Sequence, residues 1–147
     1  MASVAVLYTP EVLGLATSLA RFPITDTLDL RGQARSASCG STLTVALALD
    51  DAGKIAQVGL AAHACAIGQA AAAIFAQAAI GQTAQDIRHA EQAIAAWLAG
   101  ANGDDPAKRP DWPGLQAIAP AWGYPARHGA ILLGWRAALL AFAQPHM

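Results

Sequence analysis

The stretch KIAQVGLAAHACAIGQAAAAIFAQAA, residues 54–79, decides the fold because its hydrophobic period changes part-way along. Residues 54–60 alternate as a strand does, whereas residues 66–79 form a long, alanine-rich apolar run typical of a helix. Cys65 stands at this change, so we expect it at or just before a helix N-terminus. The stretch therefore predicts a strand that leads directly into a buried helix.

The same region is the one place where a membrane span could be considered. Residues 55–85 contain no Asp, Glu, Lys or Arg and are long enough to cross a bilayer. They are rich in weakly hydrophobic alanine, however, and include five glutamines and His63, whose burial in hydrocarbon costs free energy. We therefore predict no membrane span here and interpret the region as the interior of a soluble domain.

Upstream, the pattern predicts one helix and two further strands. Thr9-Pro10-Glu11 combines a hydroxyl cap, a first-turn proline and a carboxylate, which favour a helix start. This helix should reach about Arg21, and alternation predicts strands over residues 27–33 and 41–50. The sequence Asp50-Asp51-Ala52-Gly53 predicts a turn into the next strand, so the three strands form an antiparallel meander.

Downstream, the pattern predicts a run of helices. Thr83 and Asp86 have the spacing of a capping box. The expected helices cover residues 83–98 or 83–99, 115–118 and 125–142, with a polar, proline-rich loop over 100–113. One helix, three strands and then helices is an α+β order, with a three-stranded antiparallel sheet packed against helices. Because no repeat or linker interrupts the pattern, residues 1–147 are interpreted as a single domain.

Composition narrows the functional class. The chain has 147 residues, of which 55% are hydrophobic and 13% charged, so it is too apolar to be disordered. Nine Lys and Arg against ten Asp and Glu leave no basic stripe for nucleic acid. Two cysteines are too few for a disulfide scaffold, and residues 1–12 lack the pattern of a secretion signal. We therefore predict a cytoplasmic protein that binds neither nucleic acid nor membrane.

Few side chains could carry chemistry. Cys39 lies between the first two predicted strands, so it and Cys65 could form a metal site on folding, although their spacing alone favours packing as small hydrophobes. Ser41 lacks the sequence context of a nucleophilic serine. A Cys65 nucleophile assisted by His63 is an alternative, but side chains two residues apart on a strand are usually too distant for a hydrogen bond. We therefore predict that the chain is not an enzyme.

Several segments together resemble the IscU/SufU/NifU N-terminal family of iron–sulfur cluster assembly scaffolds, most closely the SufU branch. The strongest similarity is between AHACAIGQA, residues 62–70, and the family pattern G-H-G-C-A-I-S-Q-A. The others are YTPEV at residues 8–12, Cys39-Gly40 with the strand and turn that follow, and the segment 125–135, which resembles P-x-R-x-x-C-x-x-L-x-W. The resemblance spans nearly the whole chain and implies an α+β fold with a three-stranded sheet.

The resemblance also implies a site. In that family three cysteines and one aspartate hold zinc or an iron–sulfur cluster; Cys39 and Cys65 match two of the cysteines, while Ser41 and Ala130 occupy the other two ligand positions. A tetrahedral centre needs four good donors. The missing ones could come from His63, from His128, from water or from a second chain. Arg127 matches the family's arginine and, with Ser41 and His63, is expected to support the site.

The function implied is that of an atypical assembly scaffold with two of the three cysteines. It would bind a cluster or metal weakly, or share one across a homodimer. Its expected partners are a cysteine desulfurase or other assembly proteins. The alternative is a non-catalytic adaptor that binds a desulfurase or a partner scaffold and holds no cluster.

Overall fold

The sheet is a three-stranded antiparallel meander in the order β1-β2-β3. Its strands are β1 (Leu30–Arg35), β2 (Thr42–Leu49) and β3 (Ile55–His63). The computed structural model describes residues 7–100 and 104–144. Buried and exposed residues alternate along β1, which lies at an edge of the sheet, whereas the middle of β2 is continuously buried. The predicted α+β class and meander are confirmed.

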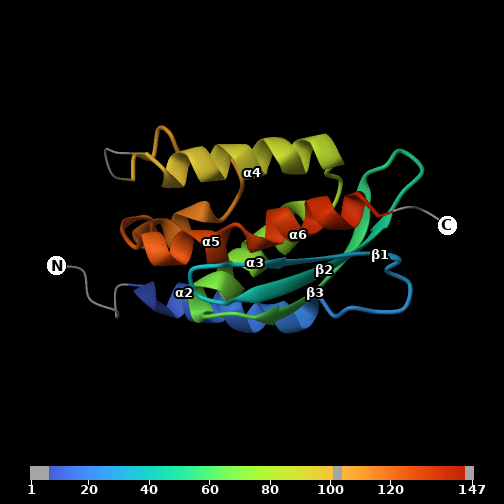
Figure 1. Cartoon of the computed structure of the whole chain (residues 1–147), viewed down its shortest axis with the longest axis horizontal. Helices are drawn as coiled ribbons and strands as arrows, with labels where there is room; N and C mark the ends of the chain where they lie inside the picture. The colour runs from blue at the N-terminus through green and yellow to red at the C-terminus, as the bar shows by residue number, and fades with distance from the viewer. Residues whose placement is uncertain (1–6, 101–103, 145–147) are drawn as a thin grey trace.

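The helices form layers around this sheet (Figure 1). They are α2 (Pro10–Thr17), η1 (Ser18–Arg21), α3 (Ala66–Ala79), α4 (Ala84–Leu98), η2 (Leu115–Gly123), η3 (Pro125–Arg127), α5 (His128–Ile131) and α6 (Leu133–Phe142). Helix α6 packs on β1 and β2, α3 packs on β3, and α2 packs on α3. Helix α4 packs on α6 and forms an outer layer. The sheet is therefore separated from α4 by the inner helices.

Small side chains allow this close layering. Helix α3 is buried along nearly its whole length, and most of its buried residues are alanines. Alanine lets two backbones approach closely, and native packing density leaves few voids between them. Phe75 of α3, Trp112 and Trp135 of α6 fill the centre as one aromatic cluster. The core of the described residues is thus built from small helical residues around a few large rings.

Several boundaries match the sequence predictions closely. Helix α3 covers the predicted residues, and its N-cap is Cys65. Helix α4 begins with the predicted capping box, in which the Thr83 hydroxyl accepts from the Asp86 amide at 3.1 Å and the Asp86 carboxylate accepts from the Thr83 amide at 3.0 Å. In the predicted turn, the Asp50 carboxylate accepts from two backbone amides. Local hydrogen bonds explain why the start of α4 and the turn were readable, and the change of hydrophobic period explains why α3 was.

Other boundaries were wrong. The first strand begins at Leu30 and not at residue 27, because residues 25–28 form a turn closed by the Leu28 amide and the Thr25 carbonyl. The first helix is α-helical only to Thr17, beyond which the chain continues as a 3₁₀ helix. The helix predicted at 115–118 is a 3₁₀ helix that extends to Gly123. Residues 101–103 of the predicted loop lie outside the described residues.

The long final helix was also wrong, because residues 125–142 form three pieces. The break between α5 and α6 falls at Leu132, and a glycine lies close to it on each side, at positions 129 and 134. Glycine is a poor residue for a helix interior, which accounts for the break. Within the described residues, no helix has both the length and the apolar character that crossing a bilayer requires.

Candidate functional site

The strand register brings both cysteines to one edge of the sheet. Thr42 pairs with Arg35 on one side and with His63 on the other. The loop from Ser36 to Ser41 therefore leaves the sheet at the edge where β3 ends. This loop is closed by backbone hydrogen bonds from the Ser36 amide to the Ser41 carbonyl and from the Gly40 amide to the Ser36 carbonyl, both 2.8 Å. Cys39 lies in the loop, and Cys65 follows β3 by two residues.

An open cleft of about 220 Å³ lies at this edge. It is lined by Cys39, Gly40, Ser41, His63, Ala64, Cys65 and Arg127. Both thiols are free; Cys39 is exposed and Cys65 is half-buried. Of the predicted site residues, Cys39, Cys65, Ser41, His63 and Arg127 therefore share one cleft.

The Cys39 sulfur forms hydrogen bonds with two buried serines. The Sγ atom lies 3.1 Å from the Ser41 Oγ and 3.4 Å from the Ser36 Oγ. Both serines are about 95% buried, so their hydroxyls have few competing partners. Hydrogen bonding with the Ser36 and Ser41 side chains lowers the pKa of the Cys39 thiol, and the positive charge of Arg127 adds a smaller effect in the same direction. Cys39 thus carries more thiolate near neutral pH than an ordinary cysteine.

Cys65 begins helix α3. As the N-cap residue it has extended backbone angles, and its side chain forms no capping hydrogen bond. The backbone N–H groups of the first helical turn are therefore not bonded to the N-cap side chain, and they lie at the end of the cleft where this thiol lies. His63, the last residue of β3, is exposed beside it. The sequence had predicted this placement of the thiol, because the change of period fell at Cys65.

A second set of contacts positions Arg127. The Ser38 hydroxyl donates to the Ala126 carbonyl at 3.0 Å, which ties the cysteine loop to η3. Gly129 allows α5 to approach the same loop, since a Cβ at Gly129 would lie 2.6 Å from the Ser36 Oγ. These contacts place the Arg127 side chain at the cleft. His128 points elsewhere: its Nε2 lies 2.7 Å from the Trp122 carbonyl oxygen, and it is not among the described residues that line the cleft.

Comparison with known proteins identifies the family. The family model described as the NifU-like N terminal domain matches residues 9–112. The chain belongs to this family. No curated protein matches the chain.

Solved structures of NifU-like and related proteins share the fold. A NifU-like protein (N-terminal) from Brucella abortus is 28% identical, with a TM-score of 0.75 over 94% of this chain and 93% of that one. A protein from the thermophile Fervidobacterium islandicum, described as an iron–sulfur cluster assembly scaffold for the SUF system, is 20% identical, with a TM-score of 0.74 over 95% of this chain and 99% of that one. The fold expected from the resemblance is therefore confirmed.

The NifU-like ligand set that the sequence resemblance implied is only half present. Ala130, at the position of the third cysteine, is fully buried and packs against Gly68 of α3, 3.3 Å from the place where a Cβ would lie. Ser41, at the aspartate position, is engaged with Cys39. Among the described residues, no group of three or more His, Cys, Asp or Glu side chains is placed to hold a metal ion. The cleft residues of one chain do not provide four good donors.

Sequence reasoning missed Ser36. Its hydroxyl contacts the Cys39 sulfur and lies 3.2 Å from the Ser38 hydroxyl, so it joins the thiol to the loop's own network. The available signal was the run Ser36-Ala37-Ser38-Cys39, in which hydroxyl residues precede a thiol at the end of a strand.

Proposed function

We propose that this NifU-like chain takes part in iron–sulfur cluster assembly and receives sulfur and iron through Cys39 and Cys65. Membership of the family supports the process, and the structure named as a SUF scaffold shares its fold. The single observation that carries the role of the thiols is their presence in one open cleft, with Cys39 exposed and held by two hydroxyls.

A cluster would be held between two copies of the chain. One copy supplies two thiols, whereas a [2Fe–2S] cluster in proteins takes four protein donors. Two copies that meet at the cleft would supply four thiolates, and the exposed rim around Cys39 leaves room for this approach. The cluster in this proposal is cargo, and it leaves when the two chains separate.

Anaerobic reconstitution with iron and sulfide tests this proposal. The wild-type chain should retain one [2Fe–2S] cluster per two chains and elute as a dimer, and Cys39→Ala/Cys65→Ala should retain none. Each single variant should lose most of the cluster. Thr44→Ala is the control, because Thr44 lies in β2 and its hydroxyl contacts Gln33. Equal and negligible iron in the wild-type chain and the double variant would contradict the scaffold role.

The second candidate is an adaptor that binds a cysteine desulfurase, or a partner scaffold, without holding a cluster. The observation that favours it is the buried alanine at position 130, which cannot ligate metal. The adaptor role predicts that the reduced, iron-free chain forms a complex with a desulfurase of the same organism, and that Cys39→Ala/Cys65→Ala binds it equally well. Absence of binding to the desulfurase and to any partner scaffold would exclude the adaptor.

A further inference from the structure

The cleft carries a positive charge that no acidic side chain balances. None of its lining residues is Asp or Glu, and Ser41 occupies the position where the sequence resemblance expects a carboxylate. In the described part of the chain the ion pairs are Arg109–Asp104 and Arg136–Glu91, and the Arg127 guanidinium forms neither an ion pair nor a hydrogen bond. A half-buried guanidinium with free donors, facing a polar cleft, is suited to bind the oxygens of an anion.

The same cleft contains a nucleophile. The Cys39 sulfur contacts two buried hydroxyls, and once the thiol loses its proton both hydroxyls can donate to the sulfur. The thiolate is the form of cysteine that attacks sulfur. Because Cys39 is also exposed, a small molecule in the cleft can reach it. The cleft thus combines a positive group that can hold oxyanions with a thiolate that can attack a bound substrate.

We propose that the cleft binds thiosulfate, an anion that has sulfonate oxygens and a transferable outer sulfur, and that Cys39 takes this outer sulfur while Arg127 holds the sulfonate. The proposal rests on the proposed function and deepens it, because it names the sulfur donor. A neutral sulfane donor would gain nothing from Arg127.

The transfer balances without any further reactant. A lone pair of the Cys39 thiolate forms a new S–S bond to the outer sulfur, and the S–S bond of thiosulfate breaks with its electron pair on the sulfonate sulfur. Sulfite leaves, and Cys39 becomes a persulfide anion. One monoanion and one dianion react to give one monoanion and one dianion, so no proton, oxidant or reductant is needed. Arg127 reduces the repulsion between the two reacting anions.

Single-turnover experiments on the full, reduced chain test this. With thiosulfate, the wild-type chain should gain one sulfur atom on Cys39, located by peptide mass spectrometry, and release one sulfite per chain. Cys39→Ser should do neither. Arg127→Gln should slow the transfer by about tenfold or more, as expected for loss of one charge-assisted contact, and Arg127→Lys should retain part of the rate. Arg109→Gln, which removes a cation outside the cleft, should react as the wild-type chain does.

A donor with no ionisable group, dimethyl trisulfide, separates recognition of the anion from reactivity of the thiol. Arg127→Gln should react with trisulfide about as fast as the wild-type chain, and sulfate should slow the thiosulfate reaction only. If trisulfide loads Cys39 and thiosulfate does not, or if Arg127→Gln slows both donors equally, the thiosulfate proposal is overturned. The proposed function is tested separately, because it is contradicted by negligible iron in the reconstituted wild-type chain. The sulfur measurements are made without iron and do not depend on that result.

Discussion

At the scale of single residues, the Ser36 and Ser41 hydroxyls both lower the pKa of Cys39. Ser41→Ala removes one of the two hydroxyls that lower the pKa of this thiol, so the pKa should rise toward its ordinary value. The rate of Cys39 alkylation should then decrease several-fold at neutral pH, with its midpoint at higher pH. Iodoacetamide labelling across a pH series, followed on the Cys39 peptide, measures this. Thr44→Ala should leave the profile unchanged, and an unchanged profile in Ser41→Ala would contradict the role of the hydroxyl.

The same lowered pKa predicts a pH dependence of stability. Because the folded pKa of Cys39 lies below that of the unfolded thiol, deprotonation favours the folded state. This contribution is fully present above the unfolded pKa, about 8.5, and is lost as the pH falls through the folded value. Denaturant unfolding between neutral and alkaline pH should show a gain in the wild-type chain that is absent from Cys39→Ser. A gain of the same size in Cys39→Ser would assign it to other groups.

Restoring the missing ligands tests why one chain lacks a metal site. Ser41→Asp/Ala130→Cys should bind one Zn²⁺ per chain, whereas the wild-type chain should bind it far more weakly. Ala130 is fully buried against Gly68, so Ala130→Cys should cost roughly 1–3 kcal/mol of stability through overpacking. Competition with a zinc-binding dye gives the affinity, and urea unfolding gives the stability. Each single variant is a control, since it supplies only three of the four donors. Equal affinity of the double variant and the wild-type chain would show that the cleft cannot bring the four donors together.

The residues of the site were only partly readable from the sequence. Cys39 and Cys65 were predicted to converge, and the structure places them in one cleft. Ser36 was missed, and His128 lies outside the residues that line the cleft. Both outcomes have the same cause, because hydrogen bonds across a folded loop and the direction of a helical side chain depend on tertiary contacts. The spacing of residues along the sequence does not indicate such tertiary contacts.

At the scale of secondary-structure elements, the capping box should account for much of the stability of the α4 N-terminus. Thr83→Ala removes the hydroxyl that accepts from the Asp86 amide, and it should cost about 1 kcal/mol. The Thr83 amide, with a smaller effect of the Thr83 side chain, lowers the pKa of Asp86. The stability that the ionised Asp86 carboxylate adds is therefore present above the ordinary carboxyl pKa and is lost as the pH falls through the lowered value. Urea unfolding of both chains at neutral and acidic pH measures the difference. Thr83→Ser keeps the hydroxyl and should be nearly neutral; an equal loss in both variants would point to another cause.

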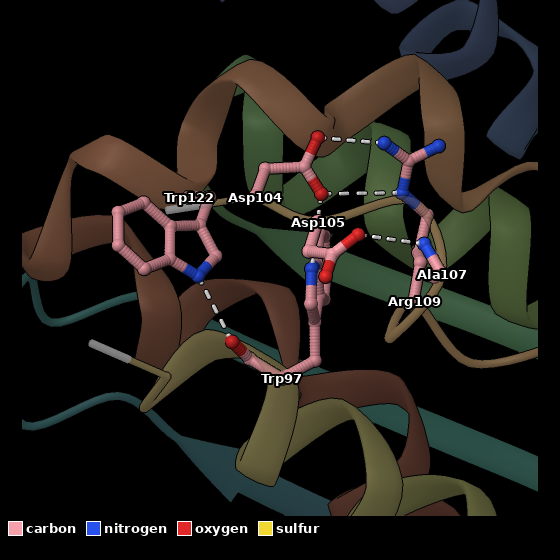
Figure 2. A network of polar contacts seen from close by, with 6 residues as sticks. All are labelled: Trp97, Asp104, Asp105, Ala107, Arg109 and Trp122. Carbon is pink, nitrogen blue, oxygen red and sulfur yellow. Dashed lines mark hydrogen bonds and ion pairs between the residues drawn. The ribbon is translucent and has the colours of Figure 1, made fainter. Parts of the chain in front are cut away.

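Hydrogen bonds and an ion pair hold the segment after α4 against the end of that helix, as Figure 2 shows. The Asp104 carboxylate accepts from the Trp97 indole N–H at 3.0 Å and pairs with Arg109 at 2.6 Å, while the Trp122 indole N–H donates to the Trp97 carbonyl at 2.9 Å. Asp104→Ala should cost about 1–3 kcal/mol, because Trp97 is nearly buried and its N–H loses its partner.

Arg109→Ala is the comparison for this network. It removes the partly exposed ion pair with Asp104 and the contact of the guanidinium with the Trp97 ring, and it keeps the indole hydrogen bond, so it should cost about 1 kcal/mol. Glu91→Ala breaks the separate Arg136–Glu91 pair and should behave like Arg109→Ala. Chemical unfolding of the three variants ranks them, and equal losses in all three would assign the effect to the ion pair and not to the indole.

Elements that begin at a clear local signal, either a change of hydrophobic period or a capping hydrogen bond, were predicted accurately, and the others were not. Helices α3 and α4 have a clear change of period and a capping box, respectively, and both matched to within one residue. The chain beyond Pro125 also has an apolar stripe at helical spacing, yet it breaks at Leu132. Periodicity reports which face is buried; it does not report that glycines near the break allow the chain to turn against α3 and the cysteine loop.

At the scale of the whole molecule, the segment between α4 and η2 is part of the core. Trp112 stacks on Phe75 of α3 with centroids 5.9 Å apart, meets Trp135 of α6 edge-on at 5.3 Å, and donates its indole N–H to the Ile74 carbonyl at 2.9 Å. One residue of a connecting segment thus touches both inner helices. Cys65 and Arg127 of the candidate site are the N-cap residues of α3 and α5. The position of these two side chains therefore depends on how firmly the helices are packed at the centre.

Trp112→Ala should therefore destabilise the whole chain by about 3–5 kcal/mol, the range for removing a large buried aromatic side chain. Trp112→Phe keeps a ring against Phe75 and loses the hydrogen bond to Ile74, so it should lose less. Urea unfolding followed by far-ultraviolet circular dichroism and by alkylation of Cys65 should give one coincident transition in each variant, shifted most in Trp112→Ala. If Trp112→Ala left the midpoint unchanged and only loosened residues near position 112, the segment would be an appended loop, and the cleft would not depend on it.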